Sequence, residues 1–405
     1  MIAASIRRNH SFLKLWVGQT ISEIGSRITR EGIPLTAVIV LGATPAQMGI
    51  LSATGAASVL LFSMAAGVIV DRVRRRPVMI TADLCRAVLL TSVPILAALH
   101  LLSMIQLIFI AACAGVLTVL FDVAYQSYLP SIVGAEHLLE GNRLLSISSA
   151  TAEILGPSLT GFLVQLISAP LAVLLDALSF VVSGVSVWAI RAPEPAPHSS
   201  PRTPLRREMF EGMRTILEHS ALRALLWRSV TAFLSMGPMF SFYILYAIRV
   251  LHLSPSSLGI TIALGGAGSL CGGLLAARVS RRFHLKPSFF ASALIIGLSQ
   301  LLIPLAAVLP RFALAFLCVQ QLVGDCAWTI YIVNETTLRQ SVAPAHLLGR
   351  VNAAMQFASR GMLPIGALAG GFLAGSIGIV NTLWLGSVGL LLSTLWLIPF
   401  IWETP

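Results

Sequence analysis

Twelve apolar segments, separated by short polar stretches, run through almost the whole of this 405-residue chain. About 20 apolar residues in helical conformation cross the hydrocarbon core of a bilayer, and the segments are of that length. Hydrophobic residues make up 56% of the chain and charged residues only 11%, which is far from the composition of a soluble domain. The predicted fold class is therefore an all-α membrane protein, with transmembrane helices near residues 15–40, 47–70, 78–99, 104–129, 144–167, 170–190, 229–248, 256–277, 287–309, 312–336, 352–375 and 378–401.

The net charge of +11 is distributed unevenly along this pattern. With the amino terminus assigned to the cytoplasm, 21 of the 27 Lys and Arg residues fall in inside segments, and only Arg249 and Arg311 fall in outside loops. This asymmetry follows the positive-inside rule and places both termini in the cytoplasm. Topology and contact with anionic membrane lipids explain the basic excess, so we expect no nucleic-acid partner.

A polar interruption at residues 191–220 divides the twelve segments into two sets of six. Two motifs recur across it: GVIVDRVRRRP (67–77) returns as GLLAARVSRRF (273–283), and GAEHLLEGN (134–142) returns as APAHLLGRVN (343–352). Duplicated six-helix halves are typical of transporters. We predict an N-terminal six-helix bundle at 1–190, a cytoplasmic linker at 191–220 and a pseudo-symmetric C-terminal six-helix bundle at 221–405.

The later part of the linker carries apolar side chains on one helical face, namely Met209, Phe210, Met213, Ile216 and Leu217. This pattern predicts an amphipathic helix that lies along the inner membrane surface. A partner-binding helix is the alternative. A second pattern, the glycine-rich LGGAGSLCGGL (264–274), lies inside an apolar span and indicates close helix packing in preference to phosphate binding.

The loop between the second and third segments resembles the loop signature of the major facilitator superfamily. The resemblance is carried by Gly67, Asp71, Arg72, Arg75 and Arg76. It implies twelve helices in two bundles, and a cytoplasmic gate that closes when Asp71 docks near residues 349–352, where Gly67 lets a neighbouring helix approach. The alternative is that the arginines only fix topology. The second copy of the motif keeps its arginines but has Ala277 in place of the acid, which favours a gating role for Asp71.

Three further stretches are similar to the efflux branch that contains macrolide and enterobactin exporters: LWVGQTISEIGSRITREGIPL (15–35), FDVAYQSYLPSIV (121–133) and AEILGPSLTGFLV (152–164). The last resembles the antiporter signature of the fifth helix through Gly156, Pro157 and Gly161, and this resemblance implies export by exchange. Thr160 stands where the signature has a glycine. The alternative is a generic Gly/Pro contact between helices.

Acids inside predicted helices are candidates for proton coupling, because a charge in the bilayer is costly and usually functional. The candidates are Glu31, Asp122, Glu153 and Asp325. Glu153 has no charged residue within one turn on its own helix, so we expect desolvation to dominate its environment.

Each intramembrane acid has an alternative role in a structural ion pair. Spacings of four residues predict that Arg27 pairs with Glu23 or Glu31 on the same helix, and a spacing of three predicts a pair between Asp83 and Arg86. Asp176 lies near the outer end of the sixth segment, where we expect it to reach water.

In the family that the loop motif resembles, the first, fourth, seventh and tenth helices line the central cavity. In this chain the same segments are richest in polar and aromatic interruptions. The resulting candidates for contact with substrate are Glu23, Arg27, Arg30, Tyr125, Gln126, Met236, Phe240, Tyr243, Trp328, Tyr331, Asn334, Glu335 and Arg360.

The predicted function is proton-coupled export of amphipathic organic compounds such as drugs or siderophores. The alternative is a lipid or lysolipid transporter or flippase of the same fold. Neither H-E-x-x-H nor G-x-S-x-G occurs, and neither lysine follows a glycine, so we expect neither an enzyme nor an ATP-driven pump. We expect a monomer in the bacterial inner membrane, with no metal or cofactor and with the proton gradient as its energy source.

Overall fold

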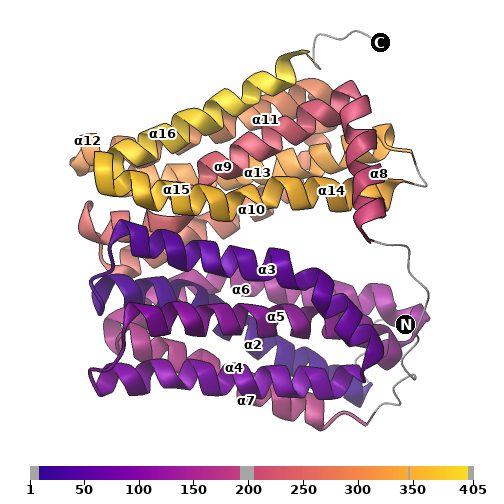
Figure 1. The fold of residues 1–405 in the computed structure, drawn as a ribbon, viewed down its shortest axis with the longest axis vertical. Coiled ribbons are helices and arrows are strands. Elements are labelled where there is room, and N and C mark those ends of the chain that lie inside the picture. Colours follow the sequence, from indigo (N-terminus) through magenta and orange to yellow (C-terminus); the bar gives the residue numbers. More distant parts are fainter. Residues whose placement is uncertain (1–8, 192–204, 345–346, 400–405) are drawn as a thin grey trace. The chain divides into compact units, whose positions relative to one another are not determined.

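The computed structural model describes residues 9–191, 205–344 and 347–399 (Figure 1). Over these residues the chain is helical and contains no strand. Contacts divide the chain into two units. The first comprises residues 1–43, 54–200 and 254–263, and the second comprises 44–53, 201–253 and 264–405. Each unit thus includes a short helical piece from the other half of the sequence, namely 254–263 in the first unit and 44–53 in the second. A single division at 191–220 assigns each of these pieces to the other unit.

The N-terminal unit is built from α2 (His10–Ile39), most of α3 (Pro45–Arg72), α4 (Arg75–Ala98), α5 (Met104–Val133), α6 (Leu138–Leu166) and α7 (Ala169–Trp188). Helix α2 packs on α6 and α7, and α4 packs on α5 and α7. The Asn9 side chain caps α2 by accepting from two backbone amides, and Ser103 with Gln106 forms a capping box at the start of α5. These caps satisfy amide groups that would otherwise be left without partners.

The C-terminal unit contains α8 (Leu205–Glu218), α9 (Ser220–Arg249), most of α10 (Pro255–Phe283), α11 (Leu285–Gln300), α12 (Leu302–Val308), α13 (Ala313–Val342), α14 (Leu348–Arg360), α15 (Met362–Ile377), α16 (Ile379–Leu392) and the 3₁₀ turn η3 (Ser393–Leu397). Two spans are interrupted, at Leu301 between α11 and α12 and at Gly361 between α14 and α15. Pro304 and Pro364 lie three residues beyond these breaks. A proline has no N–H to donate to the carbonyl four residues earlier, so each of these two prolines removes one helical hydrogen bond at its break.

The twelve predicted transmembrane segments each coincide with a helix or with a broken pair of helices, which confirms the fold class. Among the described residues, ten helical stretches are long and apolar enough to cross a membrane by length and composition alone. The two long helices below that threshold are α2 and α6. Their polar and charged side chains lower their hydropathy, and the same side chains make them the most informative helices for function.

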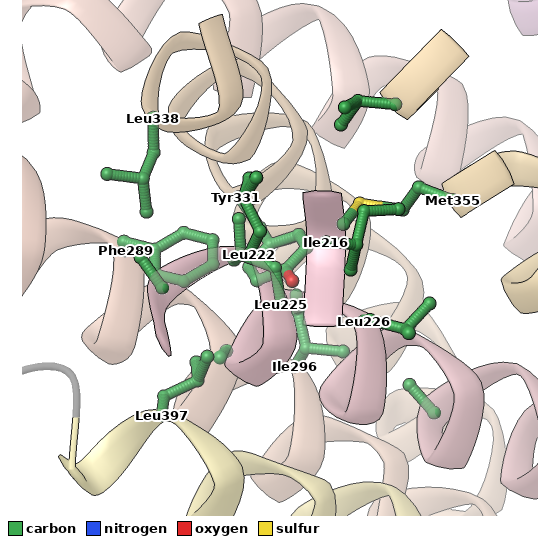
Figure 2. Packing of buried hydrophobic residues seen from close by; sticks show 14 of the residues in the cluster. Ile216, Leu222, Leu225, Leu226, Phe289, Ile296, Tyr331, Leu338, Met355 and Leu397 are labelled. Carbon is green, nitrogen blue, oxygen red and sulfur yellow. The ribbon is translucent and has the colours of Figure 1, made fainter. Parts of the chain in front are cut away.

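Each unit has its own apolar core. In the N-terminal unit the cluster includes Phe12, Met79 and Tyr128, all fully buried. In the C-terminal unit the side chains of Leu222, Phe289 and other residues from α9, α11 and α13 converge, and Ile216 of α8 joins them (Figure 2). Inside a bilayer such side chains stabilise the unit through van der Waals packing between helices.

The predicted linker helix is present as α8, and residues 192–204 before it lie outside the described part of the chain. Helix α8 packs on α14, with Ile216 fully buried in the core of the C-terminal unit. Phe210, on the same predicted apolar face, is 71% exposed. The apolar face therefore packs against protein at Ile216, where the sequence predicted contact with the membrane surface.

The glycine-rich stretch of α10 packs closely on α13, as predicted. A Cβ atom at Gly268 or Gly272 would clash with the backbone carbonyl of Leu322 or Cys326. These glycines therefore allow the two helix backbones to approach more closely than larger residues would permit.

Candidate functional site

An ion pair joins α2 to α6 in the N-terminal unit. The Arg27 guanidinium lies 3.2 Å from a carboxylate oxygen of Glu153, and the two side chains are 18% and 54% exposed. The prediction that desolvation dominates at Glu153 is therefore wrong, because its partner comes from another helix and its carboxylate is accessible. The predicted pairing of Arg27 with Glu23 or Glu31 is also not observed among the described residues, since Arg27 turns towards α6.

Gly156 makes the approach of α2 to α6 possible. A Cβ atom at this position would clash with the side chain of Arg27. One turn later, buried Thr160 donates from its hydroxyl to the Gly156 carbonyl at 2.8 Å, a bond within the helix that accompanies bending. The substitution of threonine for the glycine of the antiporter signature thus leaves the α2–α6 contact intact.

Pro157 and Gly161 pack against the first residues of α10, which belong to the same unit. Gly161 lies against the Pro255 backbone, and Gly259 lies against the Pro157 carbonyl, so that a Cβ atom at either glycine would clash with backbone. The Ser158 hydroxyl also lies 3.5 Å from the Gly259 carbonyl. The motif on α6 is therefore a tight joint between α6 and the start of α10.

Glu31 lies beside this joint. It is half-buried and lines a narrow cavity of about 10 Å³ together with residues of α2, α6 and α10 that include Leu35, Pro157, Gly161 and Leu258. A cavity of that size holds roughly one water molecule. Glu31 also interacts electrostatically with Arg30 and Arg27. Glu31 therefore borders a small, mostly apolar space at this helix joint.

The acids on α5 and α7 lie in different surroundings. Asp122 and Gln126 are exposed, and Tyr125 stacks on Phe121 with ring centroids 6.1 Å apart. Asp176, expected to reach water, is instead 1% exposed and accepts a 2.8 Å hydrogen bond from Ser179. The expectation failed because the absence of a side chain at Gly25 of α2 leaves room for the Asp176 carboxyl group in the helix interface.

The predicted pair of Asp83 and Arg86 is confirmed, with 2.5 Å between a carboxylate oxygen and a guanidinium nitrogen. Both side chains are almost fully buried. The guanidinium also lies over the rings of Phe121 and Phe180, at 4.7 and 4.0 Å from their centroids. Arg86 therefore has a counter-charge and two aromatic faces.

The C-terminal unit contains a second buried arginine that the sequence analysis missed. Arg228 is 1% exposed and its guanidinium lies 3.8 Å from the centroid of the Tyr331 ring. Among the described residues no carboxylate lies within ion-pair distance of Arg228, and Glu335 pairs with Arg339 at 3.1 Å. The spacing 228, 232, 236 places Arg228 on the same face of α9 as Met236, which is the signal that could have identified it.

Aromatic side chains surround this arginine. Tyr331 stacks on Trp328 with centroids 6.0 Å apart and on Phe289 at 4.6 Å. Asn334, one turn further along α13, accepts a 2.6 Å hydrogen bond from Ser280 of α10. Of the predicted cavity residues, Trp328 and Tyr331 are therefore in direct contact, and Asn334 bonds to a neighbouring helix.

The remaining candidates of the C-terminal unit have different surroundings. Met236 is buried, Phe240 is 54% exposed, and the Tyr243 hydroxyl lies 3.5 Å from the amide nitrogen of Gln321. Asp325 packs its carboxyl group against the backbone of Gly265, and Arg360 is exposed. These positions differ in exposure and in the side chains beside them.

The loop motif is described only in part. The side chain of Asp71 lies outside the described residues, so its docking near residues 349–352 stays a prediction. Within the N-terminal unit a Cβ atom at Gly67 would meet no heavy atom within 4 Å, so no tight helix contact forms there. Arg76 donates to the backbone carbonyls of Val187 and Trp188 at the end of α7, while Arg72 is exposed.

A comparison with protein-family models matches almost the whole chain. Residues 3–402 match the family model described as transmembrane secretion effector. The chain belongs to this family of major facilitator transporters. Its relatives include macrolide efflux protein A of Streptococcus pyogenes, 24% identical over 369 residues that cover 91% of this chain and 90% of that protein. Multidrug efflux pump Tap of Mycolicibacterium fortuitum is 26% identical over 342 residues, 82% of each chain.

Solved structures show the same fold. A bacterial homologue of the iron transporter ferroportin in its inward-facing state aligns with a TM-score of 0.77 at 18% identity, covering 97% of this chain and 99% of that one. A mutant of the nucleoside transporter NupG aligns with a TM-score of 0.76 at 10% identity, covering 97% and 100%. The major facilitator fold is thus established from both sequence and structure, and the chain is a multi-pass membrane transporter.

Proposed function

We propose that the protein is a proton-coupled exporter of amphipathic organic compounds, such as drugs or siderophores, that works by alternating access in a bacterial inner membrane. The proposal includes cytoplasmic termini, in keeping with the charge distribution of the loops. The observation that carries it is the position of Glu31 at the joint of α2, α6 and α10, beside a cavity with room for about one water molecule. The relatives named for macrolide and multidrug efflux support the direction of transport and the substrate class.

The geometry suggests how the proton would be coupled to movement. A protonated Glu31 is neutral and fits the apolar contact between Pro157 and the start of α10. A deprotonated Glu31 places a charge there, at a cost in a low-dielectric environment. Loss of the proton would therefore weaken the joint, and an equilibrium between two conformations shifts when a ligand binds one of them better.

Arg27 contributes to this coupling because it pairs with Glu153 and leaves Glu31 without a direct ion pair among the described residues. Because Glu153 holds the guanidinium at 3.2 Å, Arg27 is not bound directly to Glu31. A direct ion pair would stabilise the charged carboxylate and oppose protonation. Glu153 is thus a positioning residue in this proposal, and Glu31 is the proton carrier.

The test uses proteoliposomes that take up a labelled macrolide in the export direction under an imposed proton gradient. Wild-type accumulation is expected to collapse when an ionophore dissipates the gradient. Glu31→Gln, which mimics the protonated acid, is expected to lose accumulation by more than tenfold while retaining exchange of macrolide down its own gradient. Glu218→Gln, at an exposed position of α8, is the matched control and is expected to behave as wild type.

Gradient-driven accumulation by Glu31→Gln at the wild-type level would reject Glu31 as the carrier, and the same assay on Asp122→Asn and Asp325→Asn would then test the remaining acids. A labelled lysolipid is assayed in parallel. Accumulation of lysolipid without accumulation of macrolide would replace the proposed substrate class with a lipid.

A further inference from the structure

An open pocket of about 440 Å³ lies where α7 ends, away from the joint around Glu31. Its lining consists of Lys14, Arg76, Trp188, Ala189 and Arg191. Three of these five residues are cationic and none is acidic. Small-ligand sites have volumes of about 300–1,000 Å³, so the pocket is large enough for a polar headgroup.

The cations are held in place by the end of α7. Lys14 donates to the Ala189 carbonyl at 2.9 Å, and Arg76 donates to the carbonyls of Val187 and Trp188. The last carbonyls of a helix lack intrahelical partners and favour cations, so both side chains are positioned by a structural need. The ammonium and guanidinium groups have further donors, and Arg191 adds a third charge to the same pocket.

An apolar stripe leads along α7 to this pocket. Val181, Val185 and Trp188 follow one another at spacings of four and three residues and therefore share a helical face. Their side chains are 39%, 54% and 67% exposed. Tryptophan at the end of such a stripe is typical of the membrane interface, where its ring lies at the level of the lipid headgroups.

We propose that this pocket binds the phosphate of an anionic phospholipid, with an acyl chain lying along the exposed stripe of α7. The three cations recognise the phosphate group by charge-assisted hydrogen bonds, and the stripe separates a lipid from a soluble phosphate. Arg76 then has a role beyond the predicted gate: it links the loop motif to a bound lipid at the end of α7.

The experiment measures binding of phosphatidylglycerol to the purified full-length protein by native mass spectrometry, with phosphatidylcholine as the reference lipid. The triple variant Lys14→Gln/Arg76→Gln/Arg191→Gln is compared with Arg278→Gln/Arg281→Gln/Arg282→Gln. The control variant removes the same charge from exposed arginines of α10. The pocket variant is expected to lose the preference for phosphatidylglycerol, and the control variant is expected to keep it.

A single variant protects the test against misfolding, because Arg191→Gln leaves both cations bound to the α7 carbonyls. It is expected to bind phosphatidylglycerol about fivefold more weakly, the change that corresponds to one cation near an anionic lipid. Unchanged binding in both Arg191→Gln and the triple variant would overturn the proposal. Displacement of phosphatidylglycerol by millimolar inorganic phosphate would also overturn it, by showing a site for the soluble anion.

Discussion

Among the described residues, each of the two units buries one arginine, and the two arginines are stabilised in different ways. In the N-terminal unit Asp83 lies 2.5 Å from Arg86, so the pair carries no net charge. In the C-terminal unit Arg228 lies over the face of Tyr331, and the nearby acid, Glu335, binds Arg339. An aromatic face attracts a cation without neutralising it. The buried arginine of the C-terminal unit therefore lies against an aromatic ring, whereas that of the N-terminal unit lies against a carboxylate.

The largest expected effect comes from removing the counter-charge of Arg86. Asp83→Asn leaves a buried cation without its carboxylate, and breaking a buried ion pair in this way costs about 3–5 kcal/mol. We expect a clear fall in the thermal unfolding temperature in detergent and in the yield of monodisperse protein. The double variant Asp83→Asn/Arg86→Gln is expected to recover a substantial part of the loss. An unchanged unfolding temperature for Asp83→Asn would mean that the two phenylalanine rings and the 3.1 Å hydrogen bond to the Thr118 hydroxyl suffice for Arg86.

A smaller effect is expected at Arg228, because no ion pair is broken there. A desolvated cation–π contact contributes about 2 kcal/mol. In a double-mutant cycle of Arg228→Met and Tyr331→Leu, the two changes are expected to be coupled by about that amount. Tyr331→Phe, which keeps the aromatic face, is the control and is expected to retain most of the coupling. Additive effects of Arg228→Met and Tyr331→Leu would contradict the cation–π interpretation.

The smallest effect is expected at the ion pair that joins α8 to α14. Glu211 and Arg350 are in contact, but their side chains are 36% and 35% exposed. Ion pairs that reach solvent contribute at most about 1 kcal/mol. Glu211→Gln is therefore expected to lower the unfolding temperature only slightly, and 0.5 M salt is expected to reduce the difference from wild type. A loss as large as that of Asp83→Asn would show that α8 depends on this pair for its attachment.

Spacing along the sequence predicted the features that depend on residues of one helix. It gave the twelve spans, the pair of Asp83 with Arg86 and the close packing of the glycines on α10. It could not identify partners on different helices. The ion pair of Arg27 with Glu153 joins residues 126 positions apart, and which face of α2 meets α6 depends on where Gly156 permits close approach.

The buried polar groups outside the predicted set show the same limit. Arg228 lies one residue before the predicted start of its span at 229, so it was assigned to the inner surface. Helix α9 begins earlier, at Ser220, and this extension places Arg228 inside the bundle. The position of Asp176 near a helix end predicts that its side chain reaches water. The space beside Gly25 that its carboxyl group occupies depends on how α2 and α7 pack, which spacing along the sequence does not show.

The break between α11 and α12 has a mechanical consequence. Pro304 cannot donate to the Gln300 carbonyl, and the hydroxyl of Ser387 on α16 donates to that carbonyl instead, at 3.0 Å. A helix interrupted in this way is more compliant in bending than a continuous one, but the bond from Ser387 couples its bending to a neighbour. Any flexing of the α11–α12 span must displace α16 as well or leave a peptide carbonyl unpaired inside the membrane. We therefore expect bending of the two spans to be coupled through this hydrogen bond.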